Sequence, residues 1–439
     1  MAAFGGTVWA AVALLVALII IVTIHEYGHY IVGRLCGIHA EVFSLGFGPA
    51  LWGRTDRHGT RWQISAIPLG GYVKFLGDAD AASRPDGAAL VGLSDTERRH
   101  TMPGAPLWAR AATVAAGPFF NFALTLVLFV GLVLWNGVAV NEAIIGKVRT
   151  VPHIGEALQV GDQILSINGI ATPDMKTVFD VAETLPPDPT VTYLILRDGV
   201  QKTIAGPNPM PPIANEVLPQ SAAVDAGLAP GDVILRANGK DIATFTQLKS
   251  LTEATNGAPI LLNVWRDGAT FEVTLTPRKR DLPNAAGGFD TRWMIGLSGG
   301  VLFEPQTRPA GAFEAVDLAW SSTWLMAKTN LSAIKNIANG SISKCNVSGA
   351  IGMAKAAGYA AKQGLESFVQ LIALISLGIG LVNLFPIPVL DGGHLVFHAW
   401  EAITRRAPNE KVLGFLMTLG LAAVIVLMVF GLSNDVLCQ

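Results

Sequence analysis

Charged residues are scarce in this sequence. Asp, Glu, Lys and Arg make up 15% of the 439 residues, against about 25% in soluble globular proteins. The 31 basic and 33 acidic side chains leave a net charge of −2, which argues against a nucleic-acid partner. Cysteine is scarcer still: Cys36, Cys345 and Cys438 are too few and too scattered for a disulfide framework or a Cys-x-x-Cys zinc site. Any zinc must therefore be held by histidine and carboxylate ligands.

Basic residues are also missing from the N-terminus, where the first Lys or Arg is Arg34. The segment lacks the basic start of a signal peptide, and its apolar run is about twice the usual length. We therefore interpret it as a retained transmembrane helix.

The sequence contains long uncharged, apolar runs. The sequence is 51% hydrophobic, its mean hydropathy is +0.45, and about 20 apolar residues cross a bilayer. Four uncharged runs reach this length: Ala2–Ile24, Ala111–Val140, Ser367–Leu390 and Val412–Asn434. Any one of them could be a buried core helix. Four in one apolar chain predict a multi-span α-helical membrane protein with four transmembrane helices.

The first run leads into His25-Glu26-Tyr27-Gly28-His29, an H-E-x-x-H pattern. On a helix, His25 and His29 are one turn apart and share a face. Two imidazoles at this spacing can hold one Zn²⁺, with Glu26 in reach of water at the metal. The pentapeptide also occurs by chance. However, a charged group at the bilayer centre costs about 3 kcal/mol or more, so ionisable groups here are functional candidates.

The third run contains Asn383, two helix-breaking prolines, Pro386 and Pro388, and then Asp391. Irregular backbone at membrane depth is tolerated only where protein or water lines it. Asp391 follows 24 uncharged residues, so it is either a carboxylate at the membrane interface or a third metal ligand. His394 and His398 are alternative ligands.

The segment between the first two runs is polar. Alternating residues and glycine turns around Gly70, Gly71 and Tyr72 predict short strands and hairpins. Residues 78–104 are rich in Ala, Asp, Gly and Pro and are predicted to be mobile.

Residues 141–279 contain an internal repeat. Gly-Asp-x-Ile-Leu-x-x-Asn-Gly occurs at 161–169 and 231–239, and Arg-Asp-Gly at 197–199 and 266–268. Each copy predicts a strand, an Asn-Gly turn, a helix, a strand, an Asp-Gly hairpin and a strand. The pattern resembles PDZ domains, which bind peptides as an added strand. By this resemblance the ligand-facing strands would contain two pairs of residues: Ile145 and Gly146, and Ile213 and Ala214. The alternative is two α+β modules that only space other parts.

Residues 305–363 show a helical, partly amphipathic pattern in which Trp320 and Trp324 lie one turn apart. We predict that they lie on the outer membrane surface.

The sequence predicts eight divisions. The N-terminal half has a first transmembrane helix (1–36), a hairpin region (37–106), a second transmembrane helix (107–140) and a first PDZ-like domain (141–207). A second PDZ-like domain (208–279), a linker with amphipathic helices (280–366) and two further transmembrane helices (367–398 and 411–434) follow.

H-E-x-x-H in the first run, together with N-x-x-P-x-P-x-L-D-G in the third, resembles the site-2 proteases, a family of intramembrane zinc metalloproteases. Four spans with tandem PDZ domains between the second and third resemble the bacterial RseP-type branch. Gly117 and Asn121 match a G-x-x-x-N motif of the family's second span. Ser348-Gly349-Ala350 departs from the S-G-P often found in related chains, which leaves the local turn there open.

The resemblance implies that His25, His29 and Asp391 bind Zn²⁺ and that Glu26 is the catalytic base. It implies further that Asn383 and the strand around Gly70, Gly71 and Tyr72 contact substrate backbone, although that strand could be a plain surface hairpin. Asn121 could contact substrate in the same way or could simply pack. The implied substrates are single-span membrane proteins such as anti-sigma factors, cut after an upstream site-1 type protease, and remnant signal peptides. A catalytically silent PDZ scaffold and a transporter are the alternatives.

Positive residues favour the cytoplasmic side of short loops. The loops after the first and third spans carry seven that support this assignment: Arg54, Arg57, Arg61, Lys74, Arg405, Arg406 and Lys411. We therefore predict a multi-pass protein of the bacterial inner membrane, in contact with lipid. Its PDZ pair and both termini lie outside, and its metal site lies toward the cytoplasmic face.

Overall fold

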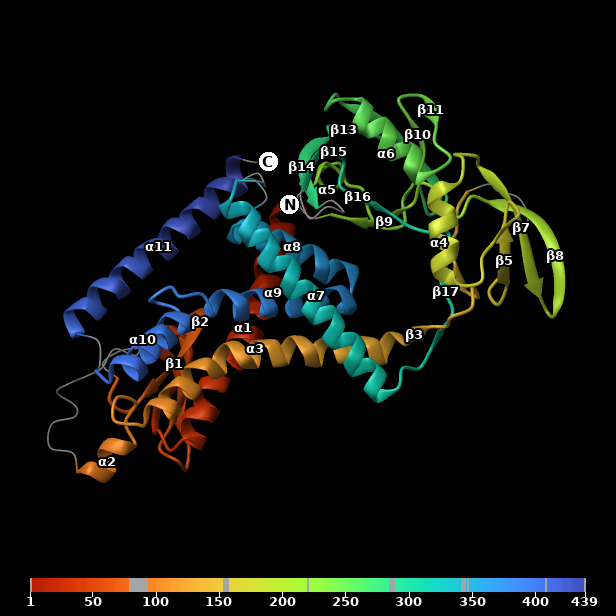
Figure 1. Cartoon of the computed structure of the whole chain (residues 1–439). Helices are drawn as coiled ribbons and strands as arrows, with labels where there is room; N and C mark the ends of the chain where they lie inside the picture. Colours follow the sequence, from red (N-terminus) through yellow and green to blue (C-terminus); the bar gives the residue numbers. More distant parts are fainter. Residues whose placement is uncertain are drawn as a thin grey trace. The chain divides into compact units, whose positions relative to one another are not determined.

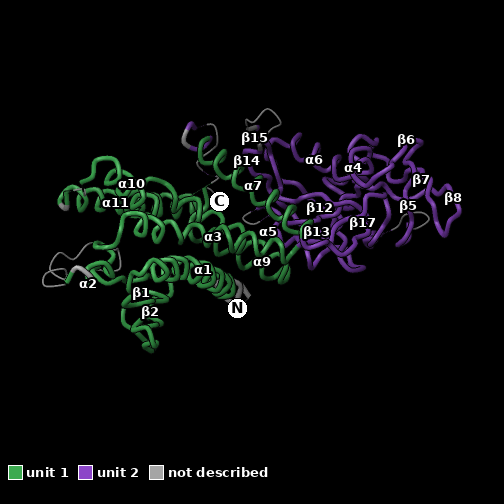
Figure 2. The backbone as a smooth tube through the Cα atoms, turned by 60° about the horizontal axis from the view of Figure 1, so that its bottom comes forward, with its two compact units in different colours: residues 1–132, 313–335, 347–439 green, residues 133–312, 336–346 purple. Residues whose placement is uncertain are grey.

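The computed structural model describes residues 2–78, 94–152, 158–218, 221–283, 289–340, 345, 347–406 and 409–437. The chain divides into two compact units (Figure 2). The first comprises residues 1–132, 313–335 and 347–439 and contains the apolar helices. The second comprises residues 133–312 and 336–346 and contains the internal repeat.

Four helices in the described ranges are long and apolar enough to cross a membrane. They are α1 (Ala2–Leu35), α3 (Leu107–Asn136), α9 (Leu365–Asn383) and α11 (Glu410–Leu437). Their qualifying segments are 28, 30, 19 and 27 residues long. Each is rich in Leu, Ala, Val and Ile, which favour helix where no water competes for the backbone. The four predicted spans are thus confirmed as helices.

The third span ends earlier than predicted. A single element over 367–398 is wrong, because α9 stops at Asn383 and a separate helix, α10 (Asp391–Thr404), begins at Asp391. The prolines at 386 and 388 lack a backbone N–H and disfavour helix in the residue before them. They therefore end the helix instead of kinking it, and Asp391 stands at the start of a new helix.

Two bent antiparallel strands, β1 (Ala40–Thr55) and β2 (Arg61–Phe75), confirm the strands predicted after the first span. Residues 42–45 pair on one side with 71–74 and on the other with 61–64, and residues 52–55 pair again with 61–64. Residues 71–75 are therefore an edge of this sheet. The sheet packs against α1 (Figure 1). There the ring of Tyr30 contacts the rings of Phe43 and Trp62.

The prediction of mobility over 78–104 falls largely outside the described residues. Within them, residues 95–99 form the short helix α2 (Asp95–Arg99), which Ser94 caps.

The repeat forms two modules of the same design, as predicted. Their sheets have the strand orders β6-β5-β7-β8 and β11-β10-β12-β13, each with one helix between its second and third strands in the sequence. The first module contains β5 (Gln163–Ile167), β6 (Ile170–Ala171), α4 (Met175–Thr184), β7 (Thr190–Arg197) and β8 (Val200–Pro207). The second contains β10 (Val233–Ala237), β11 (Lys240–Asp241), α6 (Phe245–Ala254), β12 (Ile260–Arg266) and β13 (Ala269–Leu275). Left-handed Asn168 and Asp198, and Asn238 and Asp267, make the predicted hairpin turns.

The two repeated motifs of each module are joined by an ion pair. Arg197 donates two 2.7 Å hydrogen bonds to the buried Asp162, and Arg266 donates bonds of 2.6 and 2.7 Å to the buried Asp232. Both pairs are bidentate, the strongest arrangement for Arg and carboxylate. The Gly-Asp and Arg-Asp-Gly motifs recur together because each supplies one half of this pair.

Strands beyond residue 279 return to complete the modules. β16 (Leu297–Gly299) pairs with β9 (Ala214–Val217), and β17 (Phe303–Pro305) pairs with β4 (Ile145–Val148). The predicted boundary at 279 and the predicted linker from 280 are therefore wrong. The remaining short elements of this unit are α5 (Ala222–Asp225), the hairpin β14 (Arg278–Pro283) and β15 (Phe289–Met294), and the pair β3 (Val138–Ala139) and β18 (Thr307–Arg308).

Two helices follow, α7 (Ala312–Ala338) and α8 (Ala350–Gln363), in the region predicted to be helical. The Ser348-Gly349-Ala350 turn is the start of α8. Asp435 of α11 accepts hydrogen bonds from the amides of Gly349 and Gly352, at 2.9 and 3.0 Å. A carboxylate at a helix N-terminus supplies a cap, so this turn needs no proline.

The buried ion pair of the first module gives a stability prediction. Asp162→Asn removes the negative charge of the pair with Arg197, a change that costs about 3–5 kcal/mol for buried pairs. Hydrogen exchange of the full chain in micelles should become faster in β5 and β7, with the second module unchanged. Asp180→Asn is the control, because its pair with Lys176 is exposed. Equal protection of β5 in the Asp162 variant and the native chain would contradict the prediction.

The same pair gives a pH dependence. Burial alone would raise the pKa of Asp162, but the Arg197 guanidinium and the Gln159 amide hold the pKa below its usual range. The stabilisation is then complete above the ordinary carboxyl pKa of about 4, and it is lost as pH falls through the lowered value.

Candidate metal centre

The metal centre begins with α1, which carries the adjacent residues His25 and Glu26 and, one turn later, His29. The Nε2 atoms of His25 and His29 lie 3.2 Å apart, and the rings are nearly perpendicular at 84°. Both imidazoles are largely buried. The predicted placement of the two histidines on one helix face is confirmed.

Asp391 completes the cluster from the first residue of α10. Its Oδ2 lies 3.2 Å from Nε2 of His25, and its Oδ1 lies 3.5 Å from Nε2 of His29. Tetrahedral ligands with bonds of about 2.0 Å are separated by about 3.3 Å. Both separations are close to this value, and one ligand atom of each side chain lies within 4.8 Å of the others, so the set is suited to a zinc ion. Within the described residues they are the one His, Cys, Asp and Glu group close enough to hold a metal, and neither His394 nor His398 belongs to it.

A buried oxygen without a hydrogen-bond partner also fits a cation-binding site. Asp391 Oδ2 is buried and has no hydrogen-bond donor within the described part of the chain. A buried carboxylate oxygen left without a partner is costly. A metal ion at this position would satisfy it.

Helix α3 orients both imidazoles. Nδ1 of His29 lies 2.8 Å from the backbone oxygen of Thr113, so Nδ1 carries the proton and Nε2 is free to bind metal. The side-chain amide of Asn121 lies 3.1 Å from Nδ1 of His25, and its buried Oδ1 otherwise has no partner in the described residues. Turning the amide over lets Oδ1 accept from Nδ1–H of His25, which frees Nε2 in the same way. Asn121 thus hydrogen-bonds His25 and orients its ring, whereas the sequence suggested a contact with substrate.

Gly117 makes this packing possible. A Cβ at residue 117 would collide with the His29 ring and lie 2.7 Å from Cε1 of His25. The glycine and asparagine of the G-x-x-x-N motif therefore act together. Gly117 lets α3 approach the two rings, and Asn121 holds one of them.

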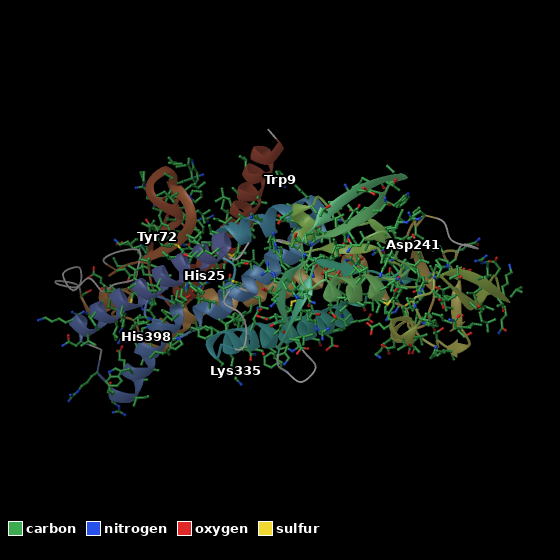
Figure 3. All side chains as sticks on the ribbon, turned by 90° about the horizontal axis from the view of Figure 1, so that it is seen from above. Trp9, His25, Tyr72, Asp241, Lys335 and His398 are labelled. Atoms are coloured by element: carbon green, nitrogen blue, oxygen red, sulfur yellow. The ribbon has the colours of Figure 1, made fainter. Side chains whose placement is uncertain are left out.

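The edge of the β1–β2 sheet lies beside Glu26. A Cβ at Gly71 would come within 3.2 Å of Cγ of Glu26 and 3.1 Å of Val22. Tyr72 follows Gly71 on the same strand, β2. Figure 3 shows the positions of Tyr72 and of His25 on α1. Within the described residues no strand other than β1 pairs with residues 71–75, and the Phe75 amide donates to Oδ2 of Asp78. The strand edge at Gly71 therefore faces the predicted catalytic base.

Asn383 is the last residue of α9 and precedes the proline turn that leads to Asp391. Its side chain is half-buried and makes no hydrogen bond within the described residues. The predicted contact between Asn383 and substrate stays a prediction.

The strands predicted to face a peptide are already paired on both sides. Ile145 and Gly146 lie in β4, which β17 flanks on one side and residues 161–164 on the other. Ile213 and Ala214 lie between β16 and residues 231–234 in the same way. The predicted ligand edges are therefore wrong, because the returning strands occupy them.

Comparison with known proteins agrees with this geometry. Residues 13–427 match the model of peptidase family M50. Over 422 residues the chain is 35% identical to a Rhizobium meliloti protein named "Putative zinc metalloprotease R01501", covering 95% of this chain and 94% of the relative. It is 33% identical to "Regulator of sigma-E protease RseP" of Salmonella typhimurium and 32% identical to the Escherichia coli protein of the same name, each covering 97% of this chain and 98% of the relative. With a family match over nearly its whole length and a histidine–aspartate centre that fits zinc, the chain belongs to peptidase family M50, the zinc-dependent site-2 proteases.

Proposed function

We propose that this zinc metalloprotease cuts peptide bonds inside the membrane-spanning segments of single-span proteins. The observation that carries the proposal is the convergence of His25, His29 and Asp391 beside helices apolar enough to lie in a membrane. Two relatives are named for sigma-E regulation, so we take anti-sigma factors as the first substrate class and remnant signal peptides as the second. A silent scaffold would need neither the ligand set nor Glu26.

Each residue of the centre has a separate task in this proposal. His25, His29 and Asp391 hold the zinc ion, which supplies Lewis-acid activation of water and of the scissile carbonyl group. Glu26 takes a proton from the attacking water and delivers it to the departing amine nitrogen. Thr113 and Asn121 keep the imidazoles in the metal-binding tautomer.

The substrate must unwind before it reacts, because a transmembrane helix shields its own peptide bonds. Unwinding leaves backbone amides without partners, at several kcal/mol each in apolar surroundings. We propose that the open edge at residues 71–75 pairs with the unwound segment as an added strand. The contact between Gly71 and Glu26 supports this, since a strand added there lies next to the catalytic base.

The two repeat modules are, in this proposal, PDZ-like domains that act as a size filter. They would exclude targets whose outer domain is still attached, so that an upstream protease must cut first. With Ile145 and Ala214 paired on both sides, a peptide would add to another edge of this unit, such as that of β16 or β17.

We propose that the protein lies in the bacterial inner membrane with the PDZ-like pair outside. The basic residues of the loops after the first and third spans support this orientation. A reporter fused after Thr276 that is active only in the cytoplasm would contradict it.

The ligand set predicts the zinc content. We expect about one zinc per chain, lost in His25→Ala and strongly reduced in Asp391→Ala, because each removes a buried ligand. His398→Ala is the matched control and should retain the metal, since His398 lies outside the cluster. Atomic emission spectrometry of the purified chain measures this. Full zinc in the double variant of His25 and Asp391 would refute the assignment.

The base prediction separates chemistry from metal binding. Glu26→Gln keeps the side-chain size but removes the proton acceptor, so cleavage should fall by at least about 10²-fold, as for loss of a general base. Zinc content should stay that of the native chain. Glu272→Gln, on an exposed strand, should keep full activity. Turnover near the native rate in Glu26→Gln would assign the base elsewhere.

The strand-addition prediction uses a matched pair of substrates. A span with two glycines inserted should be cut faster than its Leu/Ala-rich parent, because each glycine lowers helix stability by about 1 kcal/mol. The ratio of kcat/KM values in one detergent measures the effect. Equal values would remove strand addition and leave the zinc chemistry intact.

The size-filter proposal can be tested with a variant that lacks the two modules and the strands that return to them. The amide of Val140 bonds to the backbone oxygen of Gln306 at 2.9 Å, so a short linker can replace residues 141–305. We expect this variant to keep zinc and to cleave untrimmed substrates that the native chain ignores. If it still ignores them, the modules bind peptides and do not filter by size.

A further inference from the structure

A second polar site lies at the C-terminal end of α1, apart from the metal cluster. It is a cavity of about 200 Å³ lined by residues of α1, the turn after it, the β1–β2 connection and the turn after α2. Its nitrogen-bearing side chains are Arg34, His39, His58 and His100. The chain has eight histidines, two of which are metal ligands, so three of the other six gather here. No carboxylate lines the cavity within the described residues.

Hydrogen bonds determine which nitrogens of this cluster carry a proton. Arg34 is always charged, and its Nη2 lies 2.7 Å from Nε2 of His58, so the guanidinium donates and the imidazole accepts. His100 donates from Nδ1 to the backbone oxygen of Gly37 at 2.7 Å, which leaves its Nε2 available. The ring of His39 has no hydrogen-bond partner in the part of the chain that the structure describes. Several nitrogens therefore remain for a ligand.

Among the described residues the Arg34 guanidinium makes no ion pair within 4.0 Å. Its Nη1 lies 3.3 Å from the Tyr30 hydroxyl, which in turn lies 3.4 Å from Oδ2 of Asp56. Asp56 is therefore the nearby negative charge, but it is not bonded to the guanidinium, and its oxygens also accept from the backbone amides of His58 and Thr60 and from Nε1 of Trp62. A guanidinium with imidazole neighbours and no carboxylate bonded to it matches a phosphate group in charge and geometry.

The position of the cavity at the end of α1 indicates where the phosphate comes from. The apolar segment Val8–Leu35 has 28 residues, about 42 Å of helix, against about 30 Å of hydrocarbon in a bilayer. Its ends therefore reach the headgroup layer, where Arg34 would meet lipid phosphates. Leu35 beside it is 79% exposed and offers an apolar surface to an acyl chain.

We propose that this cavity binds the phosphate of an anionic phospholipid headgroup. Arg34 forms the charged contact, and His39 and the imidazolium form of His100, whose two ring nitrogens both donate, supply hydrogen bonds to the phosphate oxygens. The site lies between the end of α1 and the start of β1, because its wall contains both Arg34 and Ala40. An occupied site therefore fixes the sheet against the helix.

The test measures lipid binding by the full-length, delipidated chain in detergent. Native mass spectrometry with added phosphatidylglycerol or phosphatidylcholine should show at least fivefold tighter binding of the first, as expected for one basic residue at an anionic interface. Arg34→Gln should lose this difference. Arg405→Gln is the control, because Arg405 is an exposed basic residue at another helix end and does not line the cavity. His100→Gln repeats the test with a neutral donor in case Arg34→Gln fails to fold, and zinc content reports folding.

Inorganic phosphate distinguishes the two sources. We expect millimolar phosphate to leave phosphatidylglycerol bound. Displacement of the lipid by phosphate would make this a free-phosphate site and overturn the lipid assignment. Native-like preference for phosphatidylglycerol in both Arg34→Gln and His100→Gln would overturn the site itself.

Discussion

The protein depends on three metal-binding side chains being brought together by two separate helices, with one ligand atom of each within 4.8 Å of the others. Two imidazoles from α1 and one carboxylate from α10 at this spacing form a ligand set suited to one shared cation. The rest of the first unit can be understood as support for this approach. Helix α3 fixes the imidazoles through Thr113 and Asn121, and Gly117 leaves the space in which they stand.

A membrane makes this arrangement more demanding. Ionisable groups at depth are tolerated where they pair or line a cavity, and irregular backbone is tolerated where protein covers it. The turn between α9 and α10 meets both conditions, because it ends one helix at Asn383 and starts the next at a metal ligand. The open edge of the sheet at residues 71–75 adds the remaining requirement, a partner for substrate backbone beside Glu26.

The sequence predicted what local rules determine. The spacing of His25 and His29 follows from the helix period, and the hairpins of the modules follow from Asn-Gly and Asp-Gly turns. It could not predict what depends on distant backbone. The Thr113 partner of His29 is a carbonyl oxygen, which carries no side-chain signal, and the role of Asn121 required the crossing of α1 and α3. The strands β16 and β17 are three residues each and pair with segments far away in the chain, so no periodicity marked them. The same strands closed the edges at Ile145 and Ala214 that the resemblance had left open.

The central claim is that His25, His29 and Asp391 bind one zinc ion together. X-ray absorption spectroscopy at the zinc edge of the full-length chain tests it most directly, because it reports the ligand atoms themselves. The account predicts two imidazole nitrogens at about 2.0 Å, carboxylate oxygen at about 2.0–2.2 Å and no sulfur. A spectrum with sulfur at about 2.3 Å, or one unchanged by Asp391→Ala, would contradict it.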